Sequence, residues 1–459
     1  MARLPGGFHF PFIGDTGAVM FGYYLRLAAR SLRRNVVLTT LMVAAVGVGI
    51  GASMTVYTLL RGMSGNPIPQ KSDQLFVPQI DVWGPQSRQT GRDTLLGQLT
   101  YRDAAALMQA RRAVRQSAMY PVSQDVSPVG ARSFRAAGRA TYRDFFAMFD
   151  VPFRSGTAWN RDADEKRANV VVLSAKLADR VFPHTDAVGK VINLSDRDYR
   201  VVGVIKPWAP MPRFYDLYSG GFNEGEQFFM PFTTAIDRHI NTNGNENCQA
   251  APSGGWEAHL NSECVWLAFW VELPTAAQAR DYAGFLRNYA DEQRQLGRFH
   301  WPPRVELRNV EDWLRYMDVV PPAVRAISFV ADGFLVVCLI NAVGLLLAKF
   351  SSRARELALR RALGASRGAI FRQCVTETLL IGLVGGLLGL ALTAAGAAGL
   401  RLLLVEASQR GVDVAHLISL DAGMVVITLV VGVVVTVAAG LYPTWRASRV
   451  HPAWQLKVQ

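Results

Sequence analysis

The segment Val36–Leu60, VVLTTLMVAAVGVGIGASMTVYTLL, carries no charged side chain and is long enough to cross a lipid bilayer. A membrane-spanning helix needs about 20 predominantly apolar residues. Three further segments reach this length with few or no charges, at about Ile327–Ala348, Ile370–Val405 and Ala422–Leu441. All four segments contain the glycines that are common in membrane helices. The sequence therefore predicts four membrane spans.

The composition agrees with a membrane protein. The chain has 459 residues, of which 50% are hydrophobic and 19% charged, and its mean hydropathy is +0.14. Soluble domains usually carry about 25% charged residues. The apolar content and the lack of low-complexity tracts exclude a disordered chain. Four cysteines in a chain of this length exclude a small disulfide scaffold.

The first apolar segment is expected to remain as a membrane anchor. It begins only at Val36, is too long for the apolar region of a secretory signal peptide, and lacks a small-residue cleavage site.

The basic residues predict the orientation. Residues 1–35 carry five Lys or Arg against one acidic residue, residues 349–372 carry seven against one, and residues 446–459 carry three against none. These segments account for the whole net charge of +13, since the remainder has 34 basic and 34 acidic residues. Basic loops face the cytoplasm, which places the region from Arg61 to about Ala323 outside. The net positive charge is then explained by membrane topology and no longer supports nucleic-acid binding.

The predicted domain order follows from these spans. It is a cytoplasmic arm with an interfacial helix (1–35), span one (36–60), a periplasmic domain (61–323), span two (327–348), a cytoplasmic segment (349–369), span three (370–405), a short periplasmic loop (406–421), span four (422–441) and a cytoplasmic tail (442–459). The interfacial helix is Phe21–Arg34, whose apolar residues recur at helical spacing between arginines. A plain continuation of the first span is the alternative.

The domain between spans one and two has the pattern of a mixed α/β (α+β) fold. The expected strands are Val170–Leu173, Tyr199–Ile205, Ala268–Glu272 and Arg304–Arg308, and the expected helices are Tyr101–Arg112, Ser174–Val181 and Ala276–Gln295. Their β-α-β order suggests a ferredoxin-like unit. Gly220–Gly255, rich in Gly, Asn and aromatic residues, is expected to be a loop. The fold class is thus four transmembrane α-helices plus a large inserted α/β domain.

Cys248 and Cys264 lie in this outer domain, whereas Cys338 and Cys374 lie in or near spans. An oxidising periplasm would allow the outer pair to form a disulfide, and two unpaired buried thiols are the alternative.

The chain lacks the motifs of several enzyme classes. There is no G-x-x-x-x-G-K-[ST], the nearest fragment being Val188–Val191, and there is no H-E-x-x-H or G-x-S-x-G. The seven histidines do not pair at metal-ligand spacing. We therefore expect no catalytic residue, no metal site and no ATP bound by a P-loop in this chain.

The segment SSRARELALRRALGASRGAIFRQ, residues 351–373, predicts a short amphipathic helix between spans two and three. Ala354, Leu357, Ala358 and Leu363 form its apolar face, arginines form its polar face, and Gly364 ends it. Such a helix suits docking on a soluble partner. The alternative is a basic topology signal without a partner.

This segment, together with ETLLIGLVGGLLG after it, resembles the coupling-helix region of MacB/LolC/LolE/FtsX-type (type VII) ABC transporter permeases. Residues 31–54 are similar to the first span of that family, and residues 440–458, GLYPTWRASRVHPAWQLKV, to its C-terminus. Residues 170–205 are similar to the MacB-type periplasmic core domain. The arm 1–20 and the insert around Cys248 and Cys264 depart from the family pattern.

The resemblance implies a bacterial inner-membrane permease with both termini in the cytoplasm. It implies a dimer, either with an identical or with a related permease chain, in contact with membrane lipids. A separate ABC ATPase dimer would bind ATP and Mg, so that no cofactor is expected in this chain, and a membrane-fusion-type periplasmic adaptor is a further expected partner. The residues expected to contact the ATPase are Arg355, Glu356, Leu359, Arg360, Arg361, Leu363, Gly364 and Ala365.

Two polar residues fall inside spans. Asn341 in span two and Glu377 in span three are costly there unless they are paired. We expect them to form hydrogen bonds between helices or across the dimer, with ion translocation as the alternative.

Three functions follow. The favoured one is a permease that uses ATP hydrolysis by the partner to drive periplasmic movement, for export or extraction of a periplasmic or membrane-embedded substrate. The alternative is an FtsX-like signalling permease that activates a periplasmic hydrolase, and the third is a stand-alone receptor or enzyme. The size of the outer domain favours transport.

Overall fold

A computed structural model describes residues 26–28, 30–85, 95–128, 130, 132–408 and 422–448. The chain forms two compact units, one of which, the inserted unit, contains Met63–Val319. The other, the helical unit, contains the described residues up to Gly62, those of Val320–Ala407, and those from Ala422 onward. Each unit is described by itself.

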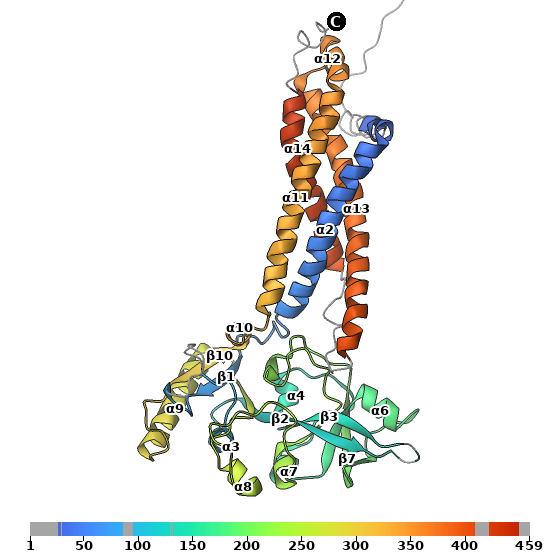
Figure 1. Cartoon of the computed structure of the whole chain (residues 1–459). Coiled ribbons are helices and arrows are strands. Elements are labelled where there is room, and N and C mark those ends of the chain that lie inside the picture. Colours follow the sequence, from blue (N-terminus) through green and yellow to red (C-terminus); the bar gives the residue numbers. More distant parts are fainter. Residues whose placement is uncertain are drawn as a thin grey trace, which may run out of the picture. The chain divides into compact units, whose positions relative to one another are not determined.

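The helical unit contains four long apolar helices, which confirms the four predicted spans (Figure 1). They are α2 (Val36–Ser64), α11 (Pro322–Ser352), α13 (Arg367–Ser408) and α14 (Ala422–Ser448). All four run beyond the apolar segments that predicted them; α14, for example, continues seven residues past Leu441. The backbone hydrogen bonds of a helix continue into polar sequence, so hydropathy marks the apolar part of a helix and not its ends.

Glycines let these helices approach closely. A Cβ at Gly385 of α13 would lie 2.8 Å from Val46 of α2, and one at Gly432 of α14 would lie 3.0 Å from the backbone of Gly386. Small residues at helix contacts are typical of membrane bundles, where van der Waals packing must hold the helices together. Glycines of α2, α13 and α14 therefore lie where these helices pack together, whereas Gly333 and Gly344 of α11 have no neighbour at that distance.

A short helix precedes α2. Within the described residues, 26–28 and 30–34 are helical, and a turn at Asn35 separates them from α2. This favours the separate helix expected before the first span over a plain continuation, although Phe21–Leu25 lie outside the described residues.

The inserted unit is built on a ten-stranded sheet, whose strand order is β10-β1-β9-β2-β3-β8-β5-β7-β4, with β6 beside β2 and β7. The strands are β1 (Leu75–Ile80), β2 (Arg115–Val126), β3 (Phe134–Thr141), β4 (Phe153–Gly156), β5 (Val170–Ser174), β6 (Val191–Leu194), β7 (Arg197–Ile205), β8 (Phe228–Pro231), β9 (Ala268–Glu272) and β10 (Val305–Asn309). The helices are α3 (Tyr101–Ala110), α4 (Asp144–Met148), α5 (Arg161–Glu165), α6 (Ala175–Val181), α7 (Phe232–Asp237), α8 (Gly255–Leu260), α9 (Ala276–Gln295) and α10 (Val310–Tyr316).

The expected ferredoxin-like unit is present. β1 pairs antiparallel with both β9 and β10, and β9 pairs antiparallel with β2. Helix α3 connects β1 to β2 and α9 connects β9 to β10, so each helix joins two parallel strands with a third strand between them, as in the split β-α-β motif. Strands β3 to β8 are inserted between β2 and β9. The predicted strands near β5 and β7 belong to this insertion and not to the ferredoxin-like unit.

One expectation for this unit was wrong. Gly220–Gly255 is not a loop throughout, because it contains β8 and α7. β8 pairs parallel with β3 and antiparallel with β5, and all four of its residues are buried. A four-residue apolar run among glycines and asparagines has too little periodicity to identify a strand, and tertiary pairing decides it.

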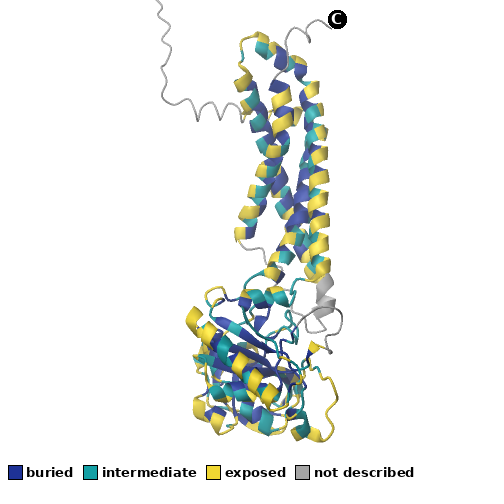
Figure 2. Cartoon of the chain, turned by 90° about the vertical axis from the view of Figure 1, so that its left-hand side faces the viewer, coloured by how far each residue is buried: buried dark blue, intermediate teal, exposed yellow. Residues whose placement is uncertain are grey.

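Buried residues run along the strands of the inserted unit (Figure 2). Aromatic side chains make up most of the largest fully buried ones. The core also encloses Arg139, whose guanidinium lies 2.9 Å from Asp216 and 2.6 Å from Glu226. Burial by itself would raise the pKa of Glu226, but Arg139 and Arg213 lower it to about 2. This ion cluster connects β3 to the segment that precedes β8.

Candidate coupling site

Helix α12 (Ala354–Ala362) lies between α11 and α13, and it is amphipathic as the sequence predicts. Ala354, Leu357 and Ala358 are buried, and Leu357 packs in an apolar cluster with Leu346, Phe350 and Ile370. Gly364 follows the helix with a φ of +100°, a conformation that glycine adopts without strain. Leu363, the fourth residue of the predicted apolar face, does not share this burial and is 80% exposed.

A buried ion cluster lies next to α12 and connects α11, α13 and the helix before α2. The carboxylate of Glu377 on α13 is 2.5 Å from Nζ of Lys349 on α11 and 3.2 Å from Nη1 of Arg353. Ser31, in the helix before α2, donates a hydrogen bond of 2.5 Å to Glu377 and accepts one from Arg353. Lys349 and Glu377 are almost completely buried. The cluster therefore connects three separate segments of the chain through one carboxylate.

The cluster continues onto α12. Arg353, between α11 and α12, contacts Glu356 at 3.3 Å. Glu356 also contacts Arg360 at 2.9 Å and Arg34 at 3.5 Å, and Arg360 donates a hydrogen bond of 2.9 Å to Gln373 on α13. These contacts connect the inner side of α12 to α13 and to the helix before α2, and Leu357 adds apolar contacts with α11.

The eight residues expected to contact an ATPase thus separate into two groups. Arg355, Leu359 (53% exposed), Leu363 and Gly364 are exposed and face outward. Glu356 and Arg360 are half-buried in the contacts described above, and Arg361 and Ala365 are partly exposed. Residues 355, 359 and 363 lie four positions apart and share one side of α12 and its end. We call Arg355, Leu359 and Leu363 the docking face.

The two intramembrane polar residues differ in environment. Glu377 is 1% exposed and paired, as expected for a charge between helices. Asn341 is exposed in the single chain, on the side of α11 that carries Ile340 and Val337. Among the described residues, Asn341 forms no side-chain hydrogen bond to another helix.

Three residues of the buried cluster were missed at the sequence level, namely Ser31, Lys349 and Arg353. Lys349 and Arg353 have the i, i+4 spacing of one helix face, and they end the second apolar segment. Two basic residues on one helix face, together with Glu377 inside the third apolar segment, could have predicted an ion pair between these two spans. Ser31 gave none, because its contact with Glu377 spans 346 residues of sequence.

In the inserted unit, the sulfurs of Cys248 and Cys264 are joined in a disulfide. Glu246 and His259 lie beside it, with His259 Nδ1 3.2 Å from Glu246 Oε1. The histidine spacing along the sequence does not show this group, because its members come from separate loops and one short helix.

Two family models match the chain. Residues 39–280 match the MacB-like periplasmic core domain, and residues 328–452 match the FtsX-like permease C-terminal region. The chain belongs to this family of type VII ABC transporter permeases. It is a multi-pass membrane protein with a periplasmic domain inserted between its first and second spans.

The chain is also similar to curated relatives and to solved structures. The chain is 24% identical over 375 residues to the macrolide export ATP-binding/permease protein MacB of Escherichia coli K12, which covers 81% of this chain and 52% of that protein. The chain thus spans about half the length of the curated relatives it matches. The periplasmic region of MacB from Actinobacillus actinomycetemcomitans is similar with a TM-score of 0.34 and 15% identity, covering 56% of this chain and 95% of that one. The extracellular domain of the transporter YknZ from Gram-positive bacteria has a TM-score of 0.33 and 11% identity, covering 50% and 99%.

Proposed function

We propose that this permease couples ATP hydrolysis by a separate cytoplasmic ATPase to movement of its periplasmic domain, for export or extraction of a periplasmic or membrane-embedded substrate. The observation that carries the proposal is α12, whose outer side presents an exposed docking face and whose inner side is fixed through a buried ion cluster. A partner that displaces α12 therefore also pulls on Glu356, Arg360 and the helices they contact.

The chemistry of the docking face fits a protein partner. Two exposed leucines beside an arginine offer apolar area with a charged rim, and such patches are typical of protein interfaces. We place ATP and Mg in the ATPase dimer and none in this chain, and we propose no enzymatic activity for the permease itself. The further partners of the proposal are a second permease chain and a membrane-fusion-type adaptor, in the bacterial inner membrane with both termini cytoplasmic.

Transport is preferred to hydrolase signalling because the MacB-like core domain matches most of the inserted region. The two functions share the coupling step and differ in the periplasmic partner. Affinity purification of the full chain with mass spectrometry separates them: an adaptor protein in the eluate supports transport, and a peptidoglycan hydrolase in its place supports signalling.

The coupling step is tested with the double variant Leu359→Glu/Leu363→Glu. Both side chains are exposed, so folding should change by less than about 0.5 kcal/mol. Two carboxylates in an apolar contact should weaken ATPase binding at least tenfold, equivalent to about 1.4 kcal/mol. The measurement is the amount of ATPase that copurifies in detergent.

Leu296→Glu is the matched control, because Leu296 is 73% exposed and ends α9 in the inserted unit. The control should retain the ATPase. Unchanged ATPase recovery in the double variant, at normal membrane levels, would show that the docking face is not the contact.

A further inference from the structure

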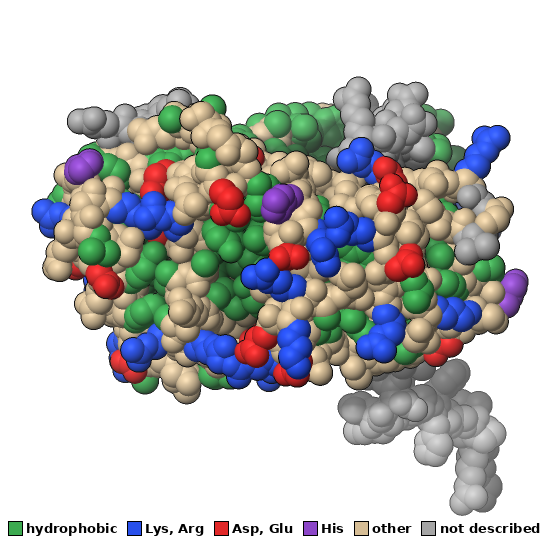
Figure 3. All heavy atoms as spheres, turned by 90° about the horizontal axis from the view of Figure 1, so that it is seen from below, with side chains coloured by type: hydrophobic (Ala, Val, Ile, Leu, Met, Phe, Trp, Pro, Cys, Tyr) green, Lys and Arg blue, Asp and Glu red, His purple; other side chains and the backbone are tan. Residues whose placement is uncertain are grey.

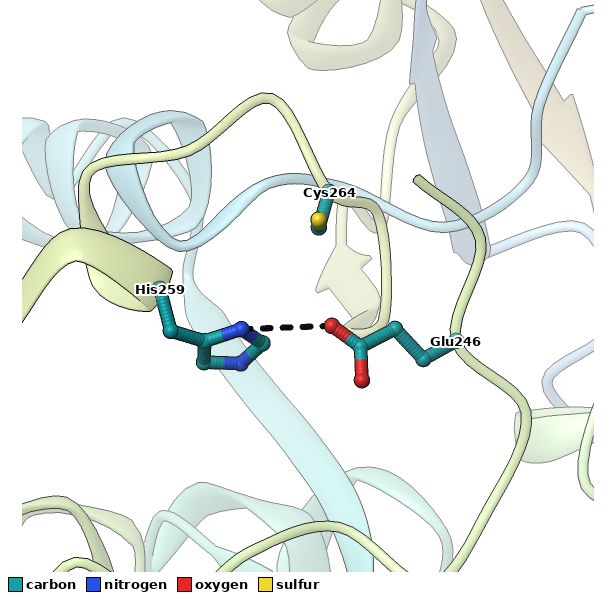
Figure 4. Close-up of side chains that lie close together, drawn as sticks. All are labelled: Glu246, His259 and Cys264. Carbon is teal, nitrogen blue, oxygen red and sulfur yellow. Dashed lines mark ion pairs between the residues drawn. The ribbon is translucent and has the colours of Figure 1, made fainter. Parts of the chain in front are cut away.

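A group of potential metal ligands surrounds the disulfide of the inserted unit. Glu246 lies in the loop before Cys248, His259 lies on α8, and Cys264 precedes β9. The ligand atoms of Glu246, His259 and Cys264 all lie within 4.8 Å of one another, and Figure 4 shows the three side chains converging. Sγ of Cys248 lies 3.5 Å from Oε1 of Glu246.

These distances match the edges of a tetrahedral zinc site. With Zn–N and Zn–O bonds of about 2.0–2.1 Å and Zn–S bonds of about 2.3 Å, a tetrahedron separates N from O by about 3.3 Å and O from S by about 3.6 Å. The observed separations are 3.2 Å for His259 Nδ1 to Glu246 Oε1 and 3.5 Å for Glu246 Oε1 to Cys248 Sγ. The ligand atom of Cys264 lies within 4.8 Å of those of Glu246 and His259, and the two sulfurs are bonded to each other.

We propose that Cys248, Cys264, His259 and Glu246 form a zinc-class divalent-metal site that exists only when the disulfide is reduced. A dithiol reductant would break the Cys248–Cys264 bond and become a disulfide itself, leaving two protein thiols. Binding of Zn²⁺ then forms two sulfur–zinc bonds and releases both thiol protons. Two thiolates, an imidazole and a carboxylate are a donor set suited to Zn²⁺.

The surroundings favour a site that survives reduction. Asn247 and Val265 exchange two backbone hydrogen bonds of 3.0 and 2.8 Å next to the cysteines, so the disulfide is not the sole connection between the two segments. Cys248 is exposed, so a reductant can reach it, whereas Cys264 is buried. Bound metal would replace one cross-link between these two segments with another.

The test uses the full chain in detergent with Cys338→Ala/Cys374→Ala, which removes the two cysteines that are free in the structure. A digest without reductant should first contain the Cys248–Cys264 peptide pair. The oxidised and reduced proteins are then titrated with Co²⁺ and Zn²⁺. We expect one Co²⁺ per reduced chain, with a thiolate-to-cobalt charge-transfer band and tetrahedral d–d bands, and no such spectrum for the oxidised chain.

His259→Gln should weaken Co²⁺ binding by the reduced chain at least tenfold. His239→Gln is the matched control. His239 lines a cavity of about 400 Å³ together with Glu246 and His259 but is not in the ligand group, so this variant should bind Co²⁺ like the parent. Zn²⁺ should also raise the melting temperature of the reduced chain alone.

Equal metal binding by the oxidised chain, a reduced chain without the charge-transfer band, or a His259→Gln variant that binds like the parent would each overturn the proposal.

Discussion

The carboxylate of Glu377 on α13 is almost completely buried, and its partners come from two other segments of the chain: Ser31 before α2, and Lys349 and Arg353 at the end of α11. A buried ion pair gains little over an apolar pair of similar size, but removing one partner leaves an uncompensated charge. Lys349 is itself fully buried and has Glu377 as its ion-pair partner at 2.5 Å. We therefore expect the cluster to favour one specific arrangement of α11, α12 and α13 more than it adds to their net stability.

Glu377→Gln should accordingly destabilise the helical unit by about 3–5 kcal/mol. The melting temperature of the detergent-solubilised chain, followed by size-exclusion chromatography after heating, measures the loss. Glu377→Gln/Lys349→Met removes both charges and should recover part of it. If the double variant is as unstable as the sum of its single variants, Lys349 and Glu377 are not coupled.

Asp164 gives the inserted unit a pH dependence. Burial raises its pKa from 3.8 to about 6, although hydrogen bonds from the Arg143 backbone and Trp159 oppose the shift. Since the folded state holds the proton more tightly than the unfolded state, stability decreases as pH rises from about 4 to about 6. Two pK units correspond to about 3 kcal/mol at most.

The comparison with Asp164→Asn isolates this effect. From pH 4 to pH 7, urea unfolding followed by tryptophan fluorescence should show the wild type losing stability relative to the variant. A stability difference that stays constant with pH would mean that Asp164 is not titrating with a raised pKa.

At the scale of elements, α12 has two sides with different surroundings. Arg360 belongs to the inner side through Glu356 and Gln373, while Leu359 and Leu363 belong to the outer side. The sequence analysis assigned all three residues to the ATPase contact. The sequence of a nine-residue helix does not show which of its sides packs against the neighbouring membrane helices.

Arg360→Glu should therefore behave differently from the leucine variant. It loses both intrachain contacts and brings a second carboxylate toward Glu356, which should lower stability by about 1 kcal/mol. We expect a lower melting temperature in detergent together with reduced ATPase recovery, whereas Leu359→Glu/Leu363→Glu should reduce recovery alone. Equal melting temperatures for wild type and Arg360→Glu would remove the distinction between the two sides.

At the scale of the whole molecule, the excess of basic residues is confined to segments that flank the membrane spans. The entire net charge of +13 lies in three segments beside the spans, and the remainder is balanced. Figure 3 shows basic and acidic side chains intermixed on the face it views, without a large area of one sign. A nucleic-acid surface would require clustered basic residues, which this face does not have.

The orientation is tested by labelling introduced cysteines with a membrane-impermeant maleimide. Arg355→Cys and Leu296→Cys both place the thiol at exposed positions. In spheroplasts, Leu296→Cys should react and Arg355→Cys should react only after permeabilisation. Labelling of Arg355→Cys in sealed spheroplasts would reverse the assigned topology. Gly364 is less suitable for this test, because its φ of +100° strains any other residue.

The sequence alone determined the features that repeat or accumulate along the chain. Apolar length predicted the four spans, and the sequence pattern located β5, β7, β9, β10, α3, α6 and α9 of the inserted unit. The orientation drawn from the basic residues stays a prediction. These signals are local, since each depends on residues within a few helical turns or one strand.

Only the tertiary structure decided which residues meet. It separated the ferredoxin-like unit β10-β1-β9-β2 from the strands inserted between β2 and β9, and it made a strand of Phe228–Pro231. It also brought Ser31 to Glu377 across 346 residues, and Glu246 and His259 to the disulfide. Such contacts depend on chain segments that are far apart in sequence, and a single sequence records each residue but not its distant partner.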